Sequence, residues 1–357
     1  MELSGLTVRN FRNLASLDLE LPPGGVVILG DNGQGKTNLL EAIYYLVLFR
    51  SLRGAKDREL VRFGEEGFFV GGQTGGVKVG AGYELASRRK KVTTDGTAVT
   101  RLSDAVGKVL AVPFAPVDRA IVAGPANGRR RYLDVLLSLA APGYLSRLTE
   151  FRAALKQRNA ALRRGRGDEA QAFDGPMADA GARVLEARTA WVERWSARFG
   201  ALTAALGERA EVRIRYRTQR PPTADPKMQM LDLLASHLDR DVRRGVTTVG
   251  PHRDDVELSL DGREVRVYGS AGQQRTAAIA LRLVEAETLK AAGGTPPIAL
   301  YDDVFAELDE DRQARLLQLI HESLPGQAIV AAPRESEVPA SLLDRPRWRV
   351  KGGRIAA

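Results

Sequence analysis

The pattern of apolar and polar positions predicts strands near the start of the chain. Residues 17–21 and 77–85 alternate apolar with polar side chains, the period of two expected of half-buried strands. Residues 26–29 form an unbroken, β-branched-rich run, which predicts a fully buried strand. Residues 90–97 lead into an Asp-Gly pair, which favours a hairpin turn. The sequence therefore predicts a β-rich segment over residues 1–112.

The middle of the chain changes to a helical period. Trp195, Phe199, Leu202 and Leu206 recur at helical spacing and define one apolar face. From about residue 247 the pattern returns to strands. We predict an α/β fold with a discontinuous head and a mainly helical inserted lobe. Since no sustained heptad repeat appears, the lobe is expected to be compact rather than a long coiled coil. The predicted head is residues 1–112 and 247–357, and the predicted lobe is residues 113–246.

A glycine-rich run between a predicted strand and a predicted helix fits G-x-x-x-x-G-K-S/T, the loop that wraps a nucleoside triphosphate. Its glycines let backbone N–H groups face phosphate oxygens, and the helix N-terminus adds positive potential. We expect Lys36 to reach the β- and γ-phosphates and Thr37 to bind Mg²⁺. The predicted binding residues are Gly30, Asp31, Asn32, Gly33, Gln34, Gly35, Lys36 and Thr37.

A second part of the same site is predicted far along the chain. Residues 298–301 are mainly apolar and lead into Asp302 and Asp303. A loop of this kind needs a carboxylate at the end of a neighbouring strand to hold the magnesium. We assign Asp302 to the metal, together with Thr37, and Asp303 to orienting water. The predicted catalytic residues are Lys36, Asp302 and Asp303.

A third motif, residues 270–275 (Ser-Ala-Gly-Gln-Gln-Arg), precedes a helical stretch at residues 276–292. Ser270, Gly272 and Gln273 combine a hydroxyl, backbone N–H groups and a helix N-terminus, which suits phosphate. One nucleotide has little need of two such surfaces in one subunit. We therefore expect this loop to cap the nucleotide bound by another copy, near residues 307–309. An ordinary helix cap remains the alternative.

Composition narrows the kind of partner. The chain has 357 residues, no cysteine and a net charge of +9, which favours a polyanionic partner. Without an apolar run of about 18 residues or a signal peptide, we expect a cytoplasmic protein and no membrane partner. Basic clusters are candidates for sequence-independent contact with nucleic acid phosphates, although solvated surfaces or internal ion pairs would explain them equally well. The candidate residues are Arg50, Arg53, Lys56, Arg129, Arg130 and Arg131.

Taken in order, these motifs resemble the ATPase head of the ABC class, in its chromosome-maintenance and recombination-repair branch. Within that branch the chain resembles the RecF family of bacterial recombination mediators. A Gly-Pro-His-Arg-Asp-Asp run and the Ser-x-Gly-Gln-Gln-Arg loop distinguish that family from its relatives. The matching segments are residues 6–14, 30–46, 129–134, 250–255, 270–275 and 301–309.

The resemblance implies an ATP- and Mg²⁺-dependent homodimer of two heads that sandwich two ATP molecules and hold DNA. It further implies weak, DNA-dependent ATPase activity on single-stranded, gapped or junction DNA at the nucleoid. The partners it implies are RecR, RecO and RecA. The protein would help RecA to displace single-strand-binding protein. Arg12 resembles an arginine that contacts phosphate in related heads.

Three departures from ABC heads stand out. Residues 112–118 lie where a glutamine loop is usual but contain no glutamine, so Asp118 or backbone is expected to sense the γ-phosphate. Residues 328–333 end without the late histidine. Asp303 stands where most such heads carry glutamate, and the shorter carboxylate implies slow hydrolysis that suits a switch.

Other functions are possible for a chain with these motifs. The ATPase subunit of an ABC transporter would be shorter and carry a full Leu-Ser-Gly-Gly-Gln, a glutamine loop and the histidine. A GTPase would need an Asn-Lys-x-Asp run, and a small-molecule kinase has no use for the capping loop. A scaffold in which ATP only drives dimerisation is not excluded by the sequence.

Overall fold

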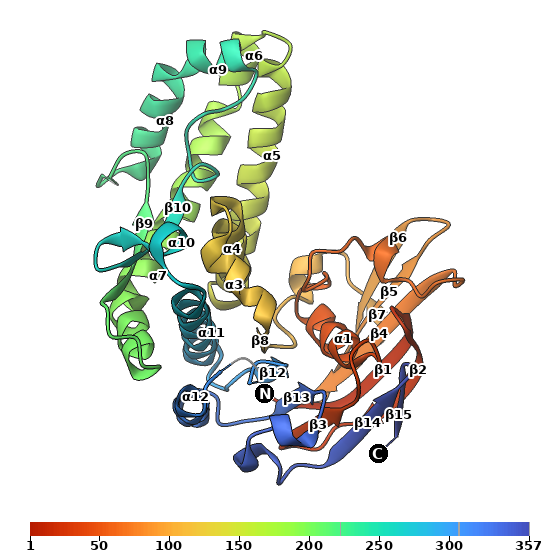
Figure 1. Cartoon of the computed structure of the whole chain (residues 1–357). Helices are drawn as coiled ribbons and strands as arrows, with labels where there is room; N and C mark the ends of the chain where they lie inside the picture. The colour runs from red at the N-terminus through yellow and green to blue at the C-terminus, as the bar shows by residue number, and fades with distance from the viewer. Residues whose placement is uncertain (222, 306–307, 357) are drawn as a thin grey trace. The chain divides into compact units, whose positions relative to one another are not determined.

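The structure is a computed structural model that describes residues 1–221, 223–305 and 308–356. It divides into two compact units, traced in Figure 1. Unit 1 comprises Met1–Asp118 and Leu281–Ala357, and unit 2 comprises Arg119–Ala280. The division into a head (residues 1–112 and 247–357) and an inserted lobe (residues 113–246) stays a proposal.

The first sheet of unit 1 is antiparallel, in the order β2-β1-β4-β5-β6-β7. The predicted strands at residues 17–21 and 77–85 fall within it. Asp95 and Gly96 both have positive φ (50° and 79°), the requirement of the tight turn predicted between β6 and β7. Its strands are β1 (Leu3–Phe11), β2 (Leu14–Glu20), β4 (Gly67–Thr74), β5 (Val77–Glu84), β6 (Arg89–Thr94) and β7 (Thr97–Ala98).

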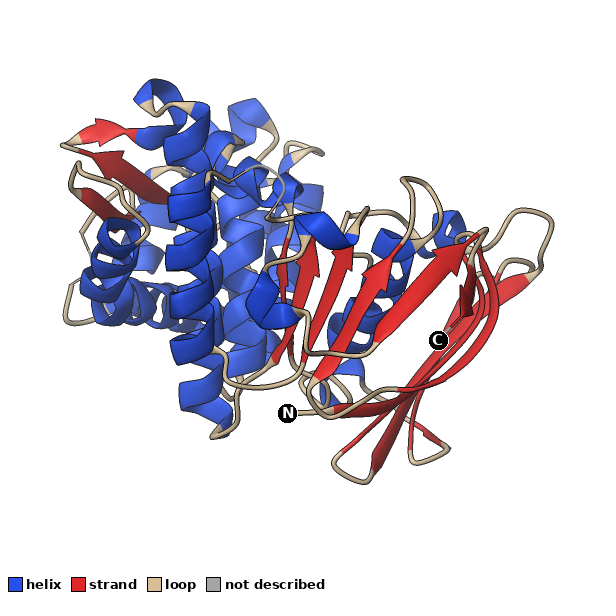
Figure 2. Ribbon diagram, turned by 60° about the horizontal axis from the view of Figure 1, so that its bottom comes forward, coloured by secondary structure: helices blue, strands red, loops and turns tan. Residues whose placement is uncertain are grey.

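The second sheet of unit 1 has the order β15-β14-β3-β13-β12-β8 and is parallel from β14 to β8. All of β3 is buried, as its unbroken apolar run predicts. Because parallel strands end at one edge, the segments after β3 and β12 meet there. Figure 2 shows these strands in red. They are β3 (Gly25–Leu29), β8 (Ala111–Phe114), β12 (Ile298–Asp302), β13 (Ala328–Ala332), β14 (Arg347–Lys351) and β15 (Arg354–Ala356).

Helix α1 (Lys36–Leu48) contacts strands of both sheets, among them β1, β4, β12 and β13. Its residues from Leu39 to Val47 are all buried, because the helix is apolar around most of its circumference. The first turn of α1 is thereby held rigidly at the edge where β3 ends. The other helices of unit 1 are α2 (Asp57–Leu60), α12 (Glu310–Ser323) and the short 3-10 helices η1 (Leu102–Asp104), η2 (Pro116–Asp118), η3 (Glu335–Glu337) and η4 (Ala340–Leu342).

Unit 2 is mainly helical, as predicted for the middle of the chain, with a small antiparallel sheet in the order β11-β10-β9. Of the predicted apolar face, Phe199, Leu202 and Leu206 are buried and Trp195 is half-buried. Its elements are α3 (Arg119–Ala123), α4 (Ala126–Ala140), α5 (Tyr144–Leu162), α6 (Gly167–Gln171), α7 (Asp174–Ala205), β9 (Val212–Arg217), α8 (Pro226–Ser236), α9 (Leu238–Arg244), β10 (Asp255–Leu260), β11 (Arg263–Glu264) and α10 (Val265–Tyr268). Helix α11 (Ala271–Gly293) contains the boundary between the units.

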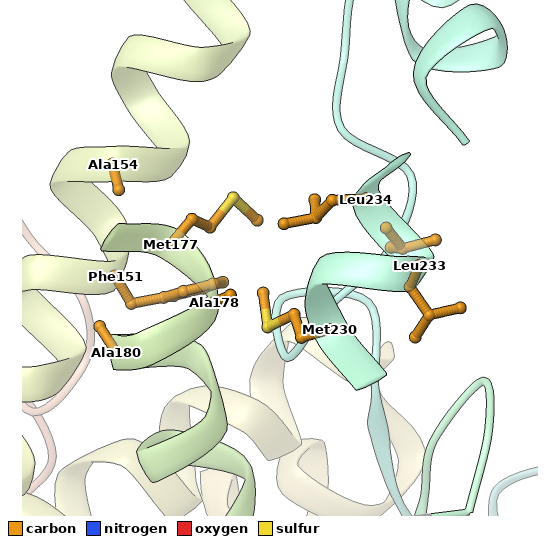
Figure 3. Close-up of a cluster of buried hydrophobic side chains, with 9 residues drawn as sticks. Phe151, Ala154, Met177, Ala178, Ala180, Met230, Leu233 and Leu234 are labelled. Carbon is orange, nitrogen blue, oxygen red and sulfur yellow. The ribbon is translucent and has the colours of Figure 1, made fainter. Parts of the chain in front are cut away.

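An apolar cluster joins α5, α7 and α8 within unit 2. Figure 3 shows Phe151, Met177, Met230 and Leu234 converging there. Burial of such side chains stabilises a fold by about 1.5–3 kcal/mol each, so this cluster explains why the segment folds compactly. In the parts of the chain that the structure describes, no helix combines the length and the apolar character needed to cross a membrane.

Candidate nucleotide-binding site

The glycine-rich loop lies between the end of β3 and the first turn of α1, as predicted. Gly33 and Gly35 have φ values of 79° and 122°, which glycine adopts without strain. The Lys36 ammonium donates to the backbone oxygens of Gly30 (2.7 Å) and Asp31 (3.3 Å), so the side chain arches back over the loop. The loop therefore gathers a cation and the N-terminus of a buried helix at one point, which is what bound phosphate requires.

Thr37 and Asp302 meet although 265 positions separate them in the sequence. The Thr37 hydroxyl donates to the Asp302 carboxylate at 2.8 Å. Burial raises the pKa of Asp302, the hydrogen bond from Thr37 opposes that rise, and neighbouring Asp303 adds to it. Hydroxyl and carboxylate oxygens are the hard ligands that Mg²⁺ prefers, so the pair fits that ion.

Asp303 follows β12 with a positive φ of 50°, an uncommon conformation for a residue other than glycine. Its Oδ1 is buried and has no hydrogen-bond partner among the described residues. Burial raises its pKa, Lys36 opposes the rise, and Glu337 adds to it. The carboxylate borders a pocket of about 480 Å³ lined by Asp31, Asn32, Pro116, Asp303, Pro333, Arg334 and Glu337. A buried, unpartnered carboxylate oxygen beside the loop can accept a hydrogen bond from a water molecule.

Arg12 contacts Glu41 in this structure and not the loop. Its guanidinium donates to both Glu41 oxygens, at 3.1 and 3.4 Å, and Arg53 and Ser51 also donate to this fully buried carboxylate. Burial raises the pKa of Glu41, but hydrogen bonds from Arg53, Ser51 and Arg12 outweigh it and hold the pKa below its usual range. A phosphate contact by Arg12 stays a prediction.

The capping loop belongs to unit 2. Ser270 Oγ accepts from the Gln273 N–H (3.2 Å), while Gln273 Oε1 accepts from the Ser270 N–H (2.9 Å), which is a reciprocal capping box on α11. The cap uses Ser270 as an acceptor and leaves its O–H available as a donor. The helix-cap alternative is thus real, and it is compatible with phosphate binding. Gln274 donates to backbone oxygens of residues 265, 266 and 269, which ties the loop to α10. Of residues 307–309, Glu307 lies outside the described residues.

The segment that replaces the glutamine loop is tied to α11. Asp118 accepts from Arg282 (2.5 Å) and from the Ala115 N–H (2.9 Å), and it is 6% exposed. Arg282 also pairs with buried Glu285 at 2.7 Å. Asp118 is therefore held in an internal network, and its neighbour Pro116 borders the pocket. At the end of β13, where the late histidine is missing, Arg334 borders the same pocket.

The candidate basic residues separate into exposed and internal ones. Arg50, Arg53, Lys56 and Arg131 are exposed. Arg129 is only 4% exposed and donates twice to Asp255, at 2.9 and 2.7 Å. Arg130 donates to the backbone oxygen of Asp254 (2.5 Å). Because Arg129 is buried, the predicted surface contact of this residue with nucleic acid is corrected. Its ion pair with Asp255 is the alternative that the sequence had left open.

Sequence reasoning missed an extended polar network in unit 2. Arg188 is buried on α7 and donates to Asp134, to the hydroxyls of Tyr144 and Tyr216, and to the Pro251 backbone oxygen. The segments 129–134 and 250–255 therefore meet in the interior. The family resemblance identified both segments, but no periodicity reveals that Arg188 bonds to residues of both. Asn13 was also missed, although its amide contacts the glycine-rich loop.

Comparisons with known proteins agree with this geometry. The AAA domain family matches residues 6–103. The structure is similar to an Smc head bound to the C-winged helix domain of ScpA, with a TM-score of 0.57 and 15% identity, covering 99% of this chain and 97% of that one. At that identity the likeness concerns the fold alone. The chain therefore has the fold of ABC-type ATPase heads, with mixed sheets in unit 1 and a mainly helical unit 2.

More similar proteins identify the family. DNA replication and repair protein RecF of Anaeromyxobacter sp. (strain Fw109-5) is 40% identical over 100% of this chain and 99% of its own length. RecF of Lactobacillus delbrueckii subsp. bulgaricus (strain ATCC 11842) is 35% identical over 99% and 97%. The solved structure of the recombination mediator RecF with ATP has a TM-score of 0.90 and 31% identity, covering 99% of this chain and 96% of that one. The chain belongs to the RecF family.

Proposed function

We propose that this chain is an ATP-dependent DNA-binding protein of recombinational repair that closes as a dimer around ATP. The observation that carries the proposal is the contact between Thr37 and Asp302, which unites the two halves of an ATPase site at one sheet edge. The capping loop supplies the second support, because Ser270 Oγ accepts a hydrogen bond in the cap while its O–H has no acceptor among the described residues.

The proposed chemistry distributes roles among residues of unit 1. Backbone N–H groups of residues 30–37 and the Lys36 ammonium hold the triphosphate of ATP. Thr37 and Asp302 would hold Mg²⁺, which supplies charge neutralisation between the β- and γ-phosphates. Asp303 accepts a hydrogen bond from the attacking water and orients that water toward the γ-phosphorus.

A second copy of the chain completes the site in this proposal. Ser270 donates its hydroxyl to a γ-phosphate oxygen of the partner's ATP, and the N–H groups near Gly272 and Gln273 approach the same oxygens. The two-fold relation repeats the contact at both sites. Loss of the γ-phosphate removes the shared ligand, so hydrolysis opens the dimer. We expect hydrolysis to be slow and DNA-dependent, as suits a switch.

DNA is the proposed polyanionic partner. The net charge of +9 and the exposed cations Arg50, Lys56 and Arg131 support contact with phosphates without sequence reading. The relatives carry the words DNA replication and repair and recombination mediator in their names. We propose action on single-stranded, gapped or junction DNA in the cytoplasm, with RecR and RecO as partners and RecA loading as the outcome. The transporter alternative is not favoured, because the relatives are repair proteins.

The absence of cysteine allows a direct test of the sandwich. Asn32 and Ala271 are exposed residues of the glycine-rich loop and the capping loop. Asn32→Cys and Ala271→Cys proteins are mixed and oxidised with and without ATP-Mg²⁺. A disulfide-linked heterodimer that forms only with ATP is expected. Met228→Cys, at an exposed residue of α8, replaces Ala271→Cys in the control mixture. Equal crosslinking without ATP, or none with it, would reject the sandwich.

Sedimentation with gapped duplex DNA tests the remaining step. The wild-type protein with ATP-Mg²⁺ is expected to sediment as a dimer on DNA, and Lys36→Met as a monomer. The Ser270→Arg variant separates the two halves of the site, since it should bind ATP but not dimerise. An ATP-dependent dimer that ignores DNA would favour the scaffold function.

A further inference from the structure

The outer side of the glycine-rich loop is held by a defined set of hydrogen bonds. A loop that turns its N–H groups toward phosphate must turn carbonyl oxygens outward, and those oxygens need donors of their own. Gln34 meets this need through two other segments of unit 1. Its backbone oxygen accepts from the Asn13 amide (3.1 Å) and from the Gly353 N–H (2.9 Å). The Gly33 oxygen receives a longer bond from the same Asn13 amide (3.4 Å).

The orientation of the Asn13 amide is determined by its neighbours. Arg53 donates to Asn38 Oδ1 at 2.6 Å, and a guanidinium can only donate. Asn38 must therefore turn its NH₂ group toward Asn13, whose Oδ1 accepts it at 2.8 Å. The remaining NH₂ group of Asn13 then faces the loop. The hydrogen bonds run in one direction, from Arg53 through Asn38 and Asn13 to Gln34.

Asn13 also fits its place closely. A Cβ on Gly35 would lie 3.0 Å from Asn13 Oδ1, and a Cβ on Gly353 would lie 2.2 Å from the Asn13 backbone oxygen. The turn after β14 adds a bond from the Gly352 N–H to Gln34 Oε1 (2.6 Å). The loop is thus supported from outside by the β1–β2 turn and by the turn between β14 and β15.

We propose that Asn13 is a positioning residue of the nucleotide site, aligned by Asn38 and Arg53. By occupying the outward oxygens of Gly33 and Gln34, it keeps the N–H groups of the loop turned toward phosphate. The inference rests on the proposed function in one respect, namely that this loop binds ATP. Asn13 does not touch the nucleotide in this proposal, and its effect is on affinity through the loop's conformation.

The test compares ATP affinity and stability in the full-length protein, using a fluorescent ATP analogue and thermal unfolding without nucleotide. Asn13→Ala is expected to weaken ATP binding about tenfold, the value of a net hydrogen bond or two. Asn13→Asp should weaken it further, because a carboxylate repels the loop oxygens. The matched control is Asn10→Ala near the end of β1, just before the turn that holds Asn13, which loses one bond to Glu65 (2.9 Å) and should keep wild-type affinity.

A second variant tests the direction of the hydrogen bonds. Asn38→Asp still accepts from Arg53 but cannot donate to Asn13, so ATP binding should weaken although neither Asn13 nor the loop is altered. In the double variant with Asn13→Ala the two losses should not add, because both act on one interaction. Additive losses would assign Asn38 an independent role and overturn the alignment.

The outcomes separate this inference from the proposed function. If Lys36→Met binds ATP as well as wild type, the loop is not the ATP site and both fail. If Lys36→Met loses binding while Asn13→Ala and Asn38→Asp stay within twofold of wild type, the positioning role alone is wrong. If Asn13→Ala lowers the melting temperature but not the affinity, its role is only structural, which also overturns the inference.

Discussion

The glycine-rich loop of unit 1 and the Arg188 network of unit 2 both bury charged side chains, but they pair them to different extents. In unit 1 the buried polar groups at the loop are incompletely paired: Lys36 reaches only backbone oxygens, and Asp303 Oδ1 has no partner among the described residues. In unit 2 the Arg188 guanidinium meets two tyrosine hydroxyls, a carboxylate and a backbone oxygen. The groups at the loop can therefore take a bound ligand as a further partner, while every nitrogen of the Arg188 guanidinium is paired by side chains and backbone of unit 2.

The pairing of its buried polar groups helps to distinguish a sequence motif that binds a ligand from one that forms an internal network. An unpaired buried polar group costs free energy, and a bound ligand can supply the missing hydrogen-bond partner. The segments 129–134 and 250–255 look as distinctive in the sequence as the glycine-rich loop, but Arg129 pairs with Asp255 and Asp134 pairs with Arg188 inside unit 2. We therefore interpret them as the interior framework of unit 2, and the loop with its acidic pair as the chemical site.

The largest effect is expected in unit 2. Arg188→Ala removes one of the two arginines paired with the buried Asp134 carboxylate, which keeps Arg152, and it leaves the Pro251 backbone oxygen without this donor. Breaking such a buried pair costs about 3–5 kcal/mol. Urea unfolding followed by tryptophan fluorescence measures the loss, with Trp191 and Trp195 on α7 reporting on unit 2 and Trp348 on β14 reporting on unit 1. Arg183→Ala is the matched control, because its ion pair with Glu186 on the same helix is exposed. A loss below about 1 kcal/mol for Arg188→Ala would contradict the framework interpretation.

Lys36→Met tests the opposite expectation in unit 1. Its ammonium is buried against backbone oxygens only, so removing the charge should change the unfolding free energy by less than about 1 kcal/mol. ATP affinity should fall at least about a hundredfold, equivalent to roughly 3 kcal/mol. Titration with a fluorescent ATP analogue measures the affinity, and thermal unfolding without nucleotide measures stability. A variant that loses both would place Lys36 in the framework rather than the site.

The third expectation concerns acid stability in unit 2. Burial raises the pKa of Asp254 to about 6, against the opposing effects of Tyr216, Arg188 and Arg130. The stability it contributes is present below its unfolded pKa near 3.8 and is lost as pH rises through about 6. Burial lowers the pKa of His252 to about 4, and the stability of its neutral form is lost as pH falls from about 6.5 toward 4.

The two gradients oppose each other between about pH 4 and 6, so the wild-type protein should show little net pH dependence from this pair. Asp254→Asn removes one gradient and should make stability fall in acid, by on the order of 2–3 kcal/mol over this range. His252→Gln should reveal the reverse slope. Urea unfolding at pH 4, 5, 6 and 7 measures both. Parallel curves for wild type and Asp254→Asn would show that Asp254 is ionised throughout.

Much of the fold could be predicted from the sequence where the signal is local. The buried strand before the loop, the alternating strands of the first sheet and the Asp-Gly turn all follow from side-chain periodicity and turn chemistry. The glycine-rich loop and Asp302 could be paired because a magnesium site demands both, even across the 265 positions between Thr37 and Asp302. The family resemblance was confirmed over nearly the whole chain.

The remainder depends on contacts that no local pattern encodes. No local pattern distinguishes Arg129 from a surface arginine in the sequence, because its ion pair with Asp255 forms only in the folded chain. The ion pairs of buried Glu41 with Arg12 and Arg53 were not predicted, and the phosphate contact of Arg12 stays a prediction. Asn13 and the Gly352–Gly353 turn acquire their contacts only when the chain's two ends meet at the loop. Sequence reasoning identified groups able to do chemistry better than groups that hold them in place.

The smallest expected effect separates exposed from internal arginines. Each phosphate contact contributes about 0.9 to the slope of log affinity against log salt concentration on duplex DNA. Arg50→Ala should reduce that slope by up to about one and leave stability within about 0.5 kcal/mol, because Arg50 is exposed. Arg129→Ala should destabilise unit 2, since Asp255 and the backbone oxygen of Gly124 lose their donor, and leave the slope unchanged in the fraction that folds. Binding to gapped duplex DNA at several salt concentrations, with ATP-Mg²⁺ present, measures both slopes. A reduced slope for Arg129→Ala with intact stability would mean that this arginine leaves its ion pair with Asp255 to bind DNA. Arg129 would then belong to a binding site and not to the paired interior network of unit 2.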